Sequence, residues 1–500
     1  MPSEAETQAP HTPPSTHFDV LIIGAGISGI GSAHHLKEQC PDKSFCVLDS
    51  MESFGGTWLM HKYPGIRSDS DLYTFGYRFK PWSGKPIATG QEILNYMNEV
   101  IEDSGLSEHI RYQHKIISAN WSSADKLWTL AVDRSDTGET TTYTCNFLWM
   151  CQGYYDHGKG YTPQWTGMDK FQGQVVHPQN WPEGLSYKDK KVIVIGSGAT
   201  AATLAPNIAD ECQHVTVLQR SPTYFFAGEN ENLLADQLRN LDVEEAWIHE
   251  ITRRQILKDQ HEHVKIAKAY PDEVKKELIQ GVKNLLPEGY DVGTHFTPNY
   301  RPWHQRIAFV PGGDLFKGIS SGKASMVTDQ IECFTDKGIL LKSGKELEAD
   351  IVMTATGFNL SVLGGIHFSV DGEAVDYSQC VTYRGMMFTG IPNMAWVMGY
   401  FRASWTLRVD LIGDFVCRLF KHMDRKHVRQ VNVTLSEEDK NMELLPWGDA
   451  EEFNPGYLQR ARHQMPKRGA SANWQHTQDY WVEREEMPMI DLDDGLFSYQ

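Results

Sequence analysis

Residues 18–36 read FDVLIIGAGISGIGSAHHL, and this stretch decides the fold. It opens with a run of apolar, partly β-branched residues, which predicts a buried parallel strand. Gly24, Gly26 and Gly29 follow in the spacing G-x-G-x-x-G, and the sequence then favours a helix. The first glycine of this spacing makes a tight turn, the second lets a pyrophosphate approach the backbone, and the third lets helix and strand pack closely. The stretch therefore predicts the start of a dinucleotide-binding unit.

The next predicted strand supports this interpretation. It reads SFCVLDS and ends near Asp49, twenty residues after Gly29. An acidic residue at this place accepts a hydrogen bond from a ribose 2′-hydroxyl, and the N–H groups at the start of the helix face the phosphates. The alternative, a glycine-rich turn without a ligand, does not explain the acid.

A second stretch of the same design occupies residues 190–209, KKVIVIGSGATAATLAPNIA, about 170 residues further on. Gly196 and Gly198 form its turn, with Ala201 in the third place. The strand that follows ends at Arg220 instead of an acid. An arginine there suits a 2′-phosphate and favours NADPH over NADH, the alternative being a solvated surface arginine. Two such units predict an α/β fold with two Rossmann-like domains, and flavin with NADPH is the natural pairing because hydride must pass between two carriers.

Composition excludes several other classes. The 500 residues carry 47 basic and 65 acidic side chains, a net charge of −18, which argues against nucleic acid as a partner. The eight cysteines form no C-x-x-C pair, which excludes a disulfide scaffold and a zinc ribbon and favours a reducing compartment. No histidine cluster has the spacing of metal ligands, so no metal is expected. Residues 1–16 predict a disordered polar tail without a signal peptide, no stretch predicts a transmembrane helix, and a cytoplasmic protein is expected.

Two longer motifs carry a family resemblance. Residues 171–182, FQGQVVHPQNWP, resemble the F-x-G-x3-H-x3-W-P/D signature of type I Baeyer–Villiger monooxygenases. Residues 55–69, GGTWLMHKYPGIRSD, resemble the second signature of that family, G-x-W-x4-Y-P-G-x3-D. The resemblance spans residues 17–480 and is strongest to the ethionamide-activating subgroup, with segments such as KYPGIRSDSD, VIVIGSGATA, GYDV, FVPGGDLF and RASWTL.

The resemblance implies a domain arrangement. An FAD-binding domain would comprise residues 17–152 and 359–500, and an NADPH-binding domain residues 153–224 and 301–358. Residues 225–300 are rich in Glu, Lys, Gln and Leu and predict a helical insertion, with Val274, Leu278, Val282 and Leu285 on one stripe of a helix. This amphipathic pattern fits a substrate gate, an oligomer contact or a contact with a membrane surface, and the sequence leaves these roles and the oligomeric state open.

The same resemblance implies the reaction: NADPH reduces FAD, O2 is consumed, and a C4a-peroxyflavin inserts oxygen next to a ketone carbonyl to give an ester or lactone. Sulfide or thioamide oxidation would be a side activity. Arg306 matches the catalytic arginine, with Asp69 as its partner, and Arg301 is the rival candidate. Gln305 stands where many members carry a lysine that grips the 2′-phosphate, so Arg220 would do most of the discrimination against NADH.

The resemblance, together with the two turns, assigns the site residues. Those expected at FAD are Gly24, Gly26, Ser28, Gly29, Asp49, Thr57, Trp58, Asp69 and Ile116. Those expected at NADPH are Arg67, Ser68, Gly196, Ser197, Gly198, Ala199, Thr200, Ala201, Arg220, Ser221 and Gln305. The linker motif consists of Phe171, Gly173, His177, Trp181 and Pro182, in which His177 would position the domains and not act as a base. Residues that either line the substrate cavity or pack in the core are Tyr400, Phe401 and Trp405.

Three alternatives stand beside the Baeyer–Villiger interpretation. A simple flavin-containing N- or S-monooxygenase would share the dinucleotide units, but the ending of the 171–182 motif and the whole 55–69 motif argue against it. An NADPH–flavin reductase without oxygenase activity would not need Arg306. A binding protein without catalysis would need neither signature.

Overall fold

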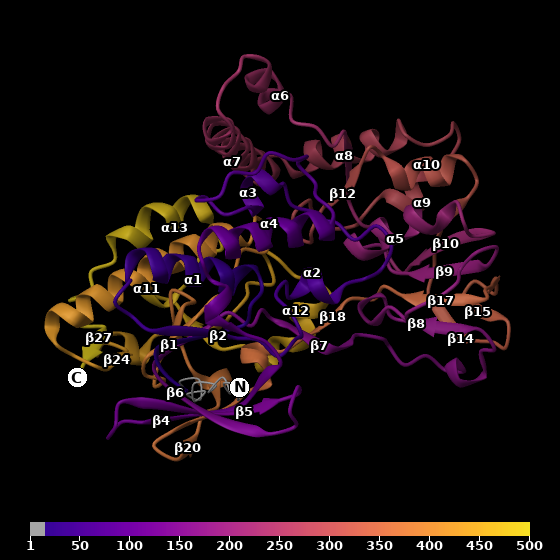
Figure 1. The fold of residues 1–500 in the computed structure, drawn as a ribbon. Helices are drawn as coiled ribbons and strands as arrows, with labels where there is room; N and C mark the ends of the chain where they lie inside the picture. Colours follow the sequence, from indigo (N-terminus) through magenta and orange to yellow (C-terminus); the bar gives the residue numbers. More distant parts are fainter. Residues whose placement is uncertain (1–15) are drawn as a thin grey trace, which may run out of the picture.

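The structure is a computed structural model that describes residues 16–500. The predicted polar tail, residues 1–16, lies outside this range except for Thr16. Figure 1 shows two lobes, each built around a sheet, with a group of helices above them. The predicted fold class, α/β with two Rossmann-like units, is confirmed by the two sheets described next.

The first lobe contains a nine-stranded sheet in the order β20-β19-β4-β5-β6-β1-β2-β3, with β23 beside β6. Its central strand β1 pairs in parallel with β2 and β6, whereas β4, β5 and β6 form an antiparallel meander. The strands are β1 His17–Ile23, β2 Phe45–Leu48, β3 Ile110–Arg111, β4 His114–Ser122, β5 Leu127–Arg134, β6 Thr140–Met150, β19 His367–Val370, β20 Glu373–Ala374 and β23 Met394–Trp396.

Strand β1 is buried on both faces. Val20 and Ile22 pack into one hydrophobic cluster, and Leu21 and Ile23 pack into another on the opposite face. This follows from the period of two along a strand. Helices α1 Ile27–Gln39, α4 Gly90–Asp103 and α11 Thr406–Lys426 pack against the face that contains Val20 and Ile22. The other helices of this lobe are α2 Thr57–Met60, α3 Leu72–Phe75, α12 Gly456–Ala461 and α13 Tyr480–Glu486.

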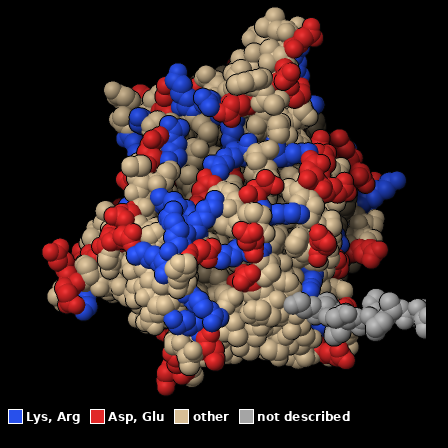
Figure 2. Space-filling view, turned by 60° about the vertical axis from the view of Figure 1, so that its left-hand side comes forward, with Lys and Arg blue, Asp and Glu red and all other residues tan. Residues whose placement is uncertain are grey.

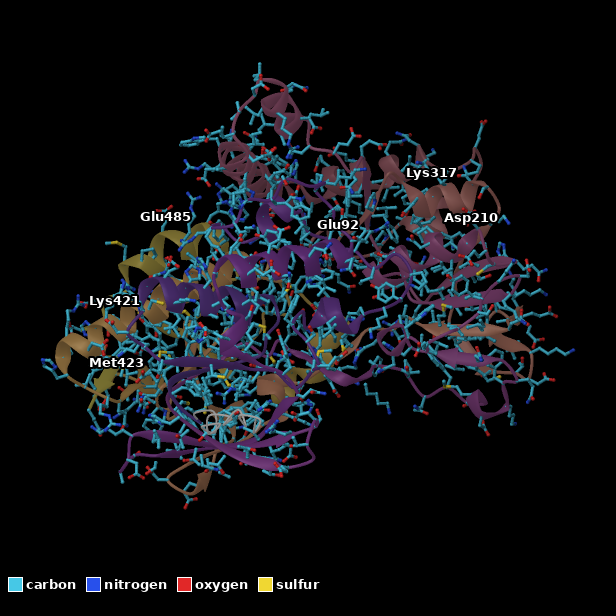
Figure 3. The ribbon with its side chains drawn as sticks, in the orientation of Figure 1. Glu92, Asp210, Lys317, Lys421, Met423 and Glu485 are labelled. Atoms are coloured by element: carbon cyan, nitrogen blue, oxygen red, sulfur yellow. The ribbon has the colours of Figure 1, made fainter. Side chains whose placement is uncertain are left out.

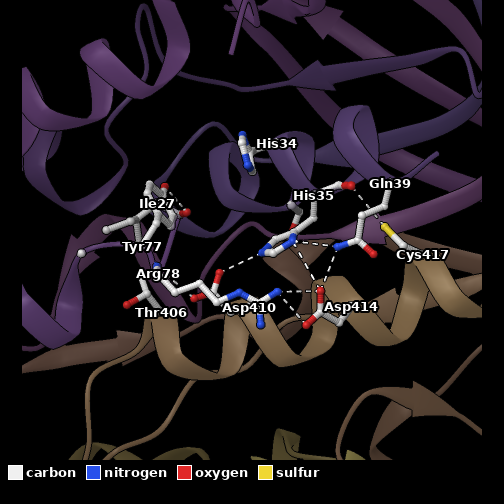
Figure 4. Close-up of polar contacts among 12 residues, drawn as sticks. Ile27, His34, His35, Gln39, Tyr77, Arg78, Thr406, Asp410, Asp414 and Cys417 are labelled. Carbon is white, nitrogen blue, oxygen red and sulfur yellow. Dashed lines mark hydrogen bonds and ion pairs between the residues drawn. The ribbon is translucent and has the colours of Figure 1, made fainter. Parts of the chain in front are cut away.

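Helix α1, which follows the first glycine turn, is held against α11 by a polar cluster (Figure 4). The ring Nε2 of His35 lies 2.8 Å from Oδ1 of Asp410, and both side chains are buried. Gln39 and Arg78 both donate to Asp414 on the next turn of α11, at 2.8 Å and 2.7 Å. Because buried polar groups need partners, these contacts fix how α1 lies on α11, and with it the position of the glycine turn.

The second lobe contains a five-stranded sheet in the order β13-β10-β9-β17-β8, and every pair in it is parallel. Its central strand β9 carries the second glycine turn, as β1 carries the first. The strands are β8 Gln174–Val176, β9 Lys191–Ile195, β10 His214–Gln219, β13 Ala324–Thr328 and β17 Ile351–Thr354. Helices α5 Ala199–Ala209 and α10 Asp314–Ser320 pack on this sheet. Between β13 and β17 the chain forms a small antiparallel sheet of β14 Ile331–Phe334, β15 Gly338–Leu341 and β16 Glu346–Glu348.

The segment predicted to be a helical insertion, residues 225–300, begins with a strand instead of a helix. Strand β11, Phe225–Gly228, pairs in parallel with β12, Ala308–Pro311, so the prediction is wrong for these four residues. Two adjacent phenylalanines favour a strand once a partner is present, and this partner, Ala308 opposite Phe225, comes 83 residues later. The helices that follow are α6 Leu233–Asn240, α7 Glu245–Ala269, α8 Pro271–Lys283 and α9 Val292–Phe296.

The predicted apolar stripe of this segment is also interrupted. Helix α8 ends at Lys283, and beyond it Leu286 is buried whereas Leu285 is 42% exposed. Val282 is buried as the helical spacing predicts. The end of the helix therefore changes which leucine faces the core.

The chain crosses between the lobes twice, at two strands that pair with each other. Strand β7, Tyr155–Gly160, leaves the first lobe, and β18, Phe358–Leu360, returns to it in the antiparallel direction. After the return, residues 359–500 add β19, β20 and β23 to the first sheet and form three small ladders. These pair β21 Thr382–Tyr383 with β22 Met387–Phe388, β24 Val431–Val433 with β27 Phe497–Tyr499, and β25 Leu444–Pro446 with β26 Lys467–Gly469.

Charged side chains cover the outside of both lobes. Exposed residues such as Lys317, Lys421 and Glu485 lie at the periphery in Figure 3. On the face shown in Figure 2, basic and acidic side chains lie next to each other over much of the surface. None of the helices within residues 16–500 combines the length and the apolar character that a membrane span requires.

Candidate active site

A cavity of about 470 Å³ lies between the two lobes. It is lined by Gly24, Gly26 and Asp49 from the first lobe and by Gly198 and Thr200 from the second. These residues follow the carboxyl ends of parallel strands, which is where open α/β sheets bind their ligands. The two predicted dinucleotide turns therefore meet at one cavity.

A larger, more open groove of about 1140 Å³ lies elsewhere on the second lobe, around Gln172, Lys190 and Asp350. It contains neither glycine turn and no residue that the sequence predicts to be catalytic. We therefore place the candidate active site in the smaller cavity.

The backbone of the first turn explains its glycines. Gly24 has a φ of +105°, a conformation that side chains disfavour. A Cβ at Gly29 would lie 1.7 Å from the carbonyl oxygen of Gly24, so no other residue fits there. At Gly26 the nearest atom to such a Cβ is the Cα of Gly56, at 3.8 Å, and the position opens into the cavity. The turn thus has the open cradle that a diphosphate requires.

Both helices that follow the turns begin without a side-chain cap. The N-cap residues of α1 and α5 are Gly26 and Gly198, and neither helix has an acidic residue in its first turn. The first N–H groups of a helix have no partner within the helix and carry partial positive charge. Each helix can therefore bind an anionic group from the cavity, and the residues present fit the diphosphates of two dinucleotides.

Asp49 lies at the carboxyl end of β2 and is 7% exposed. Its carboxylate accepts hydrogen bonds from the backbone N–H of Ala25 at 2.6 Å and of Met51 at 2.8 Å. Burial raises the pKa of Asp49, the two N–H donors lower it, and the net direction is upward. The carboxylate therefore holds the glycine turn in place in addition to its predicted contact with a ribose.

Three buried polar atoms beside the cavity have no partner among the described residues. They are Nδ1 of His61, Nη2 of Arg67 and Oε1 of Gln152, and all three residues line the cavity. Buried polar groups in native proteins are nearly always hydrogen-bonded. A polar ligand in the cavity supplies the partners that the protein does not.

The second turn is built like the first. Gly196 has a φ of +122°, and a Cβ there would lie 2.3 Å from the carbonyl oxygen of Ala355, whereas a Cβ at Gly198 would meet nothing within 4 Å. The neighbouring residues Ala199 and Thr200 also line the cavity. The Ser197 hydroxyl is hydrogen-bonded to that of Thr223, a cavity-lining residue, at 2.9 Å, and Ala201 packs in the core.

Arg220 is exposed directly after β10 and lies outside the cavity lining, as does the exposed Ser221. Within residues 16–500, Arg220 makes no ion pair or hydrogen bond. An unpaired guanidinium at the end of this strand is available to a phosphate that extends beyond the cavity.

Arg306 lies in the cavity with the predicted partner beside it. Its Nη2 donates to Oδ1 of Asp69 at 2.8 Å and to Oγ of Ser70 at 3.2 Å. The side chain is 43% exposed, and it lines the cavity. Desolvation lowers the pKa of Arg306, the carboxylate of Asp69 raises it, and the net direction is upward, so the guanidinium stays charged. The structure thus fixes a permanent cation at the cavity wall.

The rival candidate, Arg301, points elsewhere. Its Nη2 donates to the carbonyl oxygen of Glu451 at 2.7 Å and lies 3.8 Å from the carboxylate of Glu452, outside the cavity lining. Gln305, next to Arg306, does line the cavity, and its amide lies 3.5 Å from that of Asn454.

Arg67 links the two lobes at the cavity, and Ser68 lies next to it in the chain. Arg67 forms an ion pair with Asp314 at the start of α10, at 2.7 Å, which leaves its unpartnered Nη2 at the cavity. Ser68 is buried, and its hydroxyl donates to the carbonyl oxygen of Ser70 at 2.8 Å. Both residues line the cavity, as the resemblance implies for NADPH contacts.

The linker motif lies at the crossing strands and not in the cavity. The Nδ1 of His177 accepts from the backbone N–H of Gln179 at 3.1 Å, and its Nε2–H donates to the carbonyl oxygen of Gly357 at 3.1 Å. A Cβ at Gly160 would lie 2.1 Å from the His177 ring. Burial lowers the pKa of His177, so the ring is neutral at neutral pH. These contacts support the proposed positioning role.

None of the other residues of the linker motif lines the cavity. Phe171 packs in a core cluster of the second lobe, and Trp181 packs against another. A Cβ at Gly173 would lie 2.3 Å from the carbonyl oxygen of Asp350, and Pro182 is exposed.

The other predicted FAD contacts divide into two groups. Ser28, Thr57 and Trp58 line the cavity. Ile116 does not: it is 7% exposed and packs in a core cluster on β4. Its strand begins beside Asp49, because the N–H of His114 donates to the carbonyl oxygen of Asp49 at 2.7 Å.

Aromatic side chains form much of the cavity wall. Of the three that the sequence leaves open, Tyr400 and Trp405 line the cavity, whereas Phe401 packs in the core. Sequence reasoning missed the cavity residues His61, Tyr154, Tyr155, His157, Phe453 and Tyr457. The pair Tyr154-Tyr155 follows the carboxyl end of β6, a position that marks ligand sites in α/β folds. No sequence signal points to Tyr457, which lies some 300 residues later.

No group of three or more His, Cys, Asp or Glu side chains in the described part of the chain can hold a metal ion.

Comparisons with known proteins agree with this geometry. A family model for flavin-binding monooxygenase-like proteins matches residues 86–235, and one for NAD(P)-binding Rossmann-like domains matches residues 22–80. The FAD-containing monooxygenase EthA of Mycobacterium tuberculosis (strain ATCC 25618 / H37Rv) is 46% identical over 466 residues, which cover 93% of this chain and 94% of that protein. The probable FAD-binding monooxygenase AlmA of an Acinetobacter species is 43% identical over 483 residues, 96% of both chains.

Two solved structures share the fold. An oxidised steroid monooxygenase bound to NADP superposes with a TM-score of 0.75 at 22% identity, covering 97% of this chain and 99% of that one. A cyclohexanone monooxygenase with ε-caprolactone bound superposes with a TM-score of 0.74 at 20% identity, covering 97% and 100%. The similarity extends over both lobes.

Proposed function

Because this chain belongs to the family of FAD-containing monooxygenases, we propose that it inserts one oxygen atom of O2 beside the carbonyl group of a ketone. The overall reaction is ketone + O2 + NADPH + H⁺ → ester or lactone + NADP⁺ + H2O. Linear and aryl-alkyl ketones are the proposed substrates. Oxidation of sulfides or thioamides at sulfur is the proposed side activity of the same site.

The observation that carries this proposal is the Arg306–Asp69 pair in the cavity between the two dinucleotide turns. When bound, FAD and NADPH supply the redox chemistry: two electrons from NADPH reach the flavin, and the reduced flavin activates O2. Gly26 and the uncapped start of α1 would hold the FAD diphosphate, and Gly198 and the start of α5 that of NADPH.

Arg306 performs an electrostatic role in this scheme. Negative charge develops on oxygen while oxygen is transferred to a carbonyl carbon. Among the described residues, only the N–H groups on Nη2 of Arg306 have partners, Asp69 and Ser70. Three of its five donors therefore remain for the reacting oxygens. Asp69 keeps the guanidinium oriented, and a fixed donor of this kind needs no reorganisation during the reaction.

The direct test is product identification. Purified protein with FAD, NADPH and O2 is mixed with phenylacetone, with a medium-chain 2-ketone and with thioanisole, and the products are measured by mass spectrometry. Ester from either ketone is expected. Sulfoxide from thioanisole without any ester would contradict the Baeyer–Villiger assignment and favour a simple N- or S-monooxygenase.

The choice of NADPH over NADH gives a first prediction. Replacing Arg220 with alanine should lower kcat/KM for NADPH by about 10- to 100-fold, the effect of one lost hydrogen bond to a charged group. The value for NADH should not change, because NADH lacks the 2′-phosphate. Steady-state kinetics with both cofactors measure this.

Lys317→Ala is the matched control, since it removes another exposed cation from the same lobe. It should leave both kcat/KM values at the wild-type level. An equal loss with NADPH and NADH in the Arg220 variant would mean that Arg220 does not read the 2′-phosphate.

A further inference from the structure

Three tyrosine hydroxyls meet at the part of the cavity that contains Arg306. Tyr154 and Tyr155 follow β6, and Tyr457 comes from α12. The Tyr154 hydroxyl donates to that of Tyr155 at 2.7 Å. The Tyr457 ring lies 6.3 Å from the Tyr154 ring and 6.1 Å from the Tyr155 ring, between centroids, and all three residues line the cavity together with Arg306. We call Tyr154, Tyr155 and Tyr457 the phenol cluster.

In the described part of the chain, the hydroxyls of the phenol cluster have only one another as hydrogen-bond partners. Within residues 16–500, no carboxylate and no backbone carbonyl accepts the hydroxyl proton of Tyr155 or of Tyr457. Their charged neighbour, Arg306, can only donate, and three of its own N–H groups have no partner among the described residues. The acceptor nearby, Asp69, is already engaged with Arg306. An oxygen atom of a ligand in the cavity would give these donors a stronger acceptor than a neighbouring phenol.

The three phenols keep their protons. Burial raises the pKa of Tyr154, of Tyr155 and of Tyr457, and this outweighs the opposing effect of the Arg306 charge. The hydroxyls are therefore neutral donors at neutral and mildly alkaline pH. A neutral donor can bind a carbonyl oxygen without bringing a second cation beside Arg306.

Packing fixes where the hydroxyls point. The Tyr154 ring stacks on Trp405 with centroids 5.1 Å apart and 9° between the planes. Trp405 in turn donates from Nε1 to Oγ of Ser28 in the first turn of α1, at 2.7 Å. The Tyr155 ring packs on Phe358 at 4.4 Å. The cluster is thus attached to the predicted FAD turn, and its geometry is set before a ligand binds.

We propose that the hydroxyls of Tyr155 and Tyr457 bind the carbonyl oxygen of the ketone, while Arg306 faces the oxygen that is transferred. This inference rests on the proposed function. Negative charge develops on the carbonyl oxygen as its carbon becomes tetrahedral, and fixed donors stabilise that charge. A sulfide has no such oxygen, so the phenol cluster serves ketones and not sulfides.

The variant that tests this is Tyr155→Phe combined with Tyr457→Phe, which removes two hydroxyls and keeps the rings. We expect kcat/KM for a ketone to fall by about 100-fold or more, as for a lost oxyanion donor. Sulfoxidation of thioanisole by the same preparation should stay at the wild-type rate, and FAD content should be unchanged. Tyr161→Phe is the control, because Tyr161 lies next to β7 but does not line the cavity.

A second measurement does not depend on turnover. An N-methyl alkanamide has a carbonyl acceptor but is not oxidised, and its Kd for the FAD-loaded protein is measured by calorimetry. The double variant should bind it about 3- to 10-fold more weakly per lost hydrogen bond, and Tyr161→Phe should bind it normally. Equal losses with ketone and sulfide, or unchanged amide binding, would overturn the inference. If the wild type makes no ester, the proposed function fails, but the amide titration still decides whether the hydroxyls bind a carbonyl.

Discussion

Replacing Arg306 with alanine is expected to lower ester formation by about 100- to 1000-fold, the effect of removing an oxyanion donor from a catalytic site. The cavity loses its permanent cation, and Asp69 loses its partner at 2.8 Å. FAD should stay bound, because among the described residues the Arg306 side chain is hydrogen-bonded to Asp69 and Ser70 and not to either glycine turn. NADPH oxidation should continue with hydrogen peroxide as the product. Ester is measured by mass spectrometry, and NADPH and peroxide are measured in the same reaction.

Two further variants make the Arg306 experiment specific. Arg301→Ala removes the nearby arginine that points to Glu451 and Glu452 instead of the cavity, and it should retain ester formation. Arg306→Lys keeps a charge but not the planar fork of donors, so only partial recovery is expected. Full ester formation by Arg306→Ala would show that another group stabilises the reacting oxygen.

The second large effect is expected at the first glycine turn. In Gly29→Ala the new Cβ would lie 1.7 Å from the carbonyl oxygen of Gly24, a backbone atom that cannot move without opening the turn. We expect a loss of about 3 kcal/mol or more in the free energy of unfolding, at or beyond the upper end of ordinary overpacking, and a protein that purifies without FAD. Thermal or denaturant unfolding and the flavin absorbance measure the two effects.

Gly26→Ala is the matched comparison. The nearest atom to its Cβ would be the Cα of Gly56 at 3.8 Å, which is ordinary van der Waals contact. The protein should therefore fold with nearly wild-type stability but bind FAD more weakly, because the methyl group occupies the cradle. If Gly26→Ala retains FAD with wild-type affinity, the diphosphate does not approach the backbone at this position.

The parts of the fold that the sequence predicts are those that depend on neighbouring residues. The strand, turn and helix around Gly24 are local, and so are those around Gly196, which is why both units appear where they are predicted. The strand Phe225–Gly228 could not be predicted in this way, because its partner is β12, far along the chain. Leu285 is exposed, although helical spacing places it on the apolar stripe, because α8 ends at Lys283.

The candidate site shows the same division. The contact between Arg306 and Asp69 joins residues 237 positions apart, and only the family resemblance suggested it. No sequence motif marks Tyr457. It lies on α12, which follows the return of the chain to the first lobe, so only the folded structure places it in the cavity. The sequence leaves open whether Phe401 lines the cavity or packs in the core; it packs in the core, and Phe453 lines the cavity. Aromatic residues suit both places, so side-chain packing alone decides between them.

The most direct test of the proposed function is an ¹⁸O₂ labelling experiment. The wild-type protein, with FAD and NADPH, converts a linear 2-ketone under ¹⁸O₂, and fragmentation in the mass spectrometer locates the label in the product. We predict an ester with one ¹⁸O atom in the bridging position between the carbonyl carbon and the migrated group, and an unlabelled carbonyl oxygen. NADPH consumption with unlabelled ketone recovered, while thioanisole in a parallel reaction yields labelled sulfoxide, would contradict oxygen insertion beside the carbonyl.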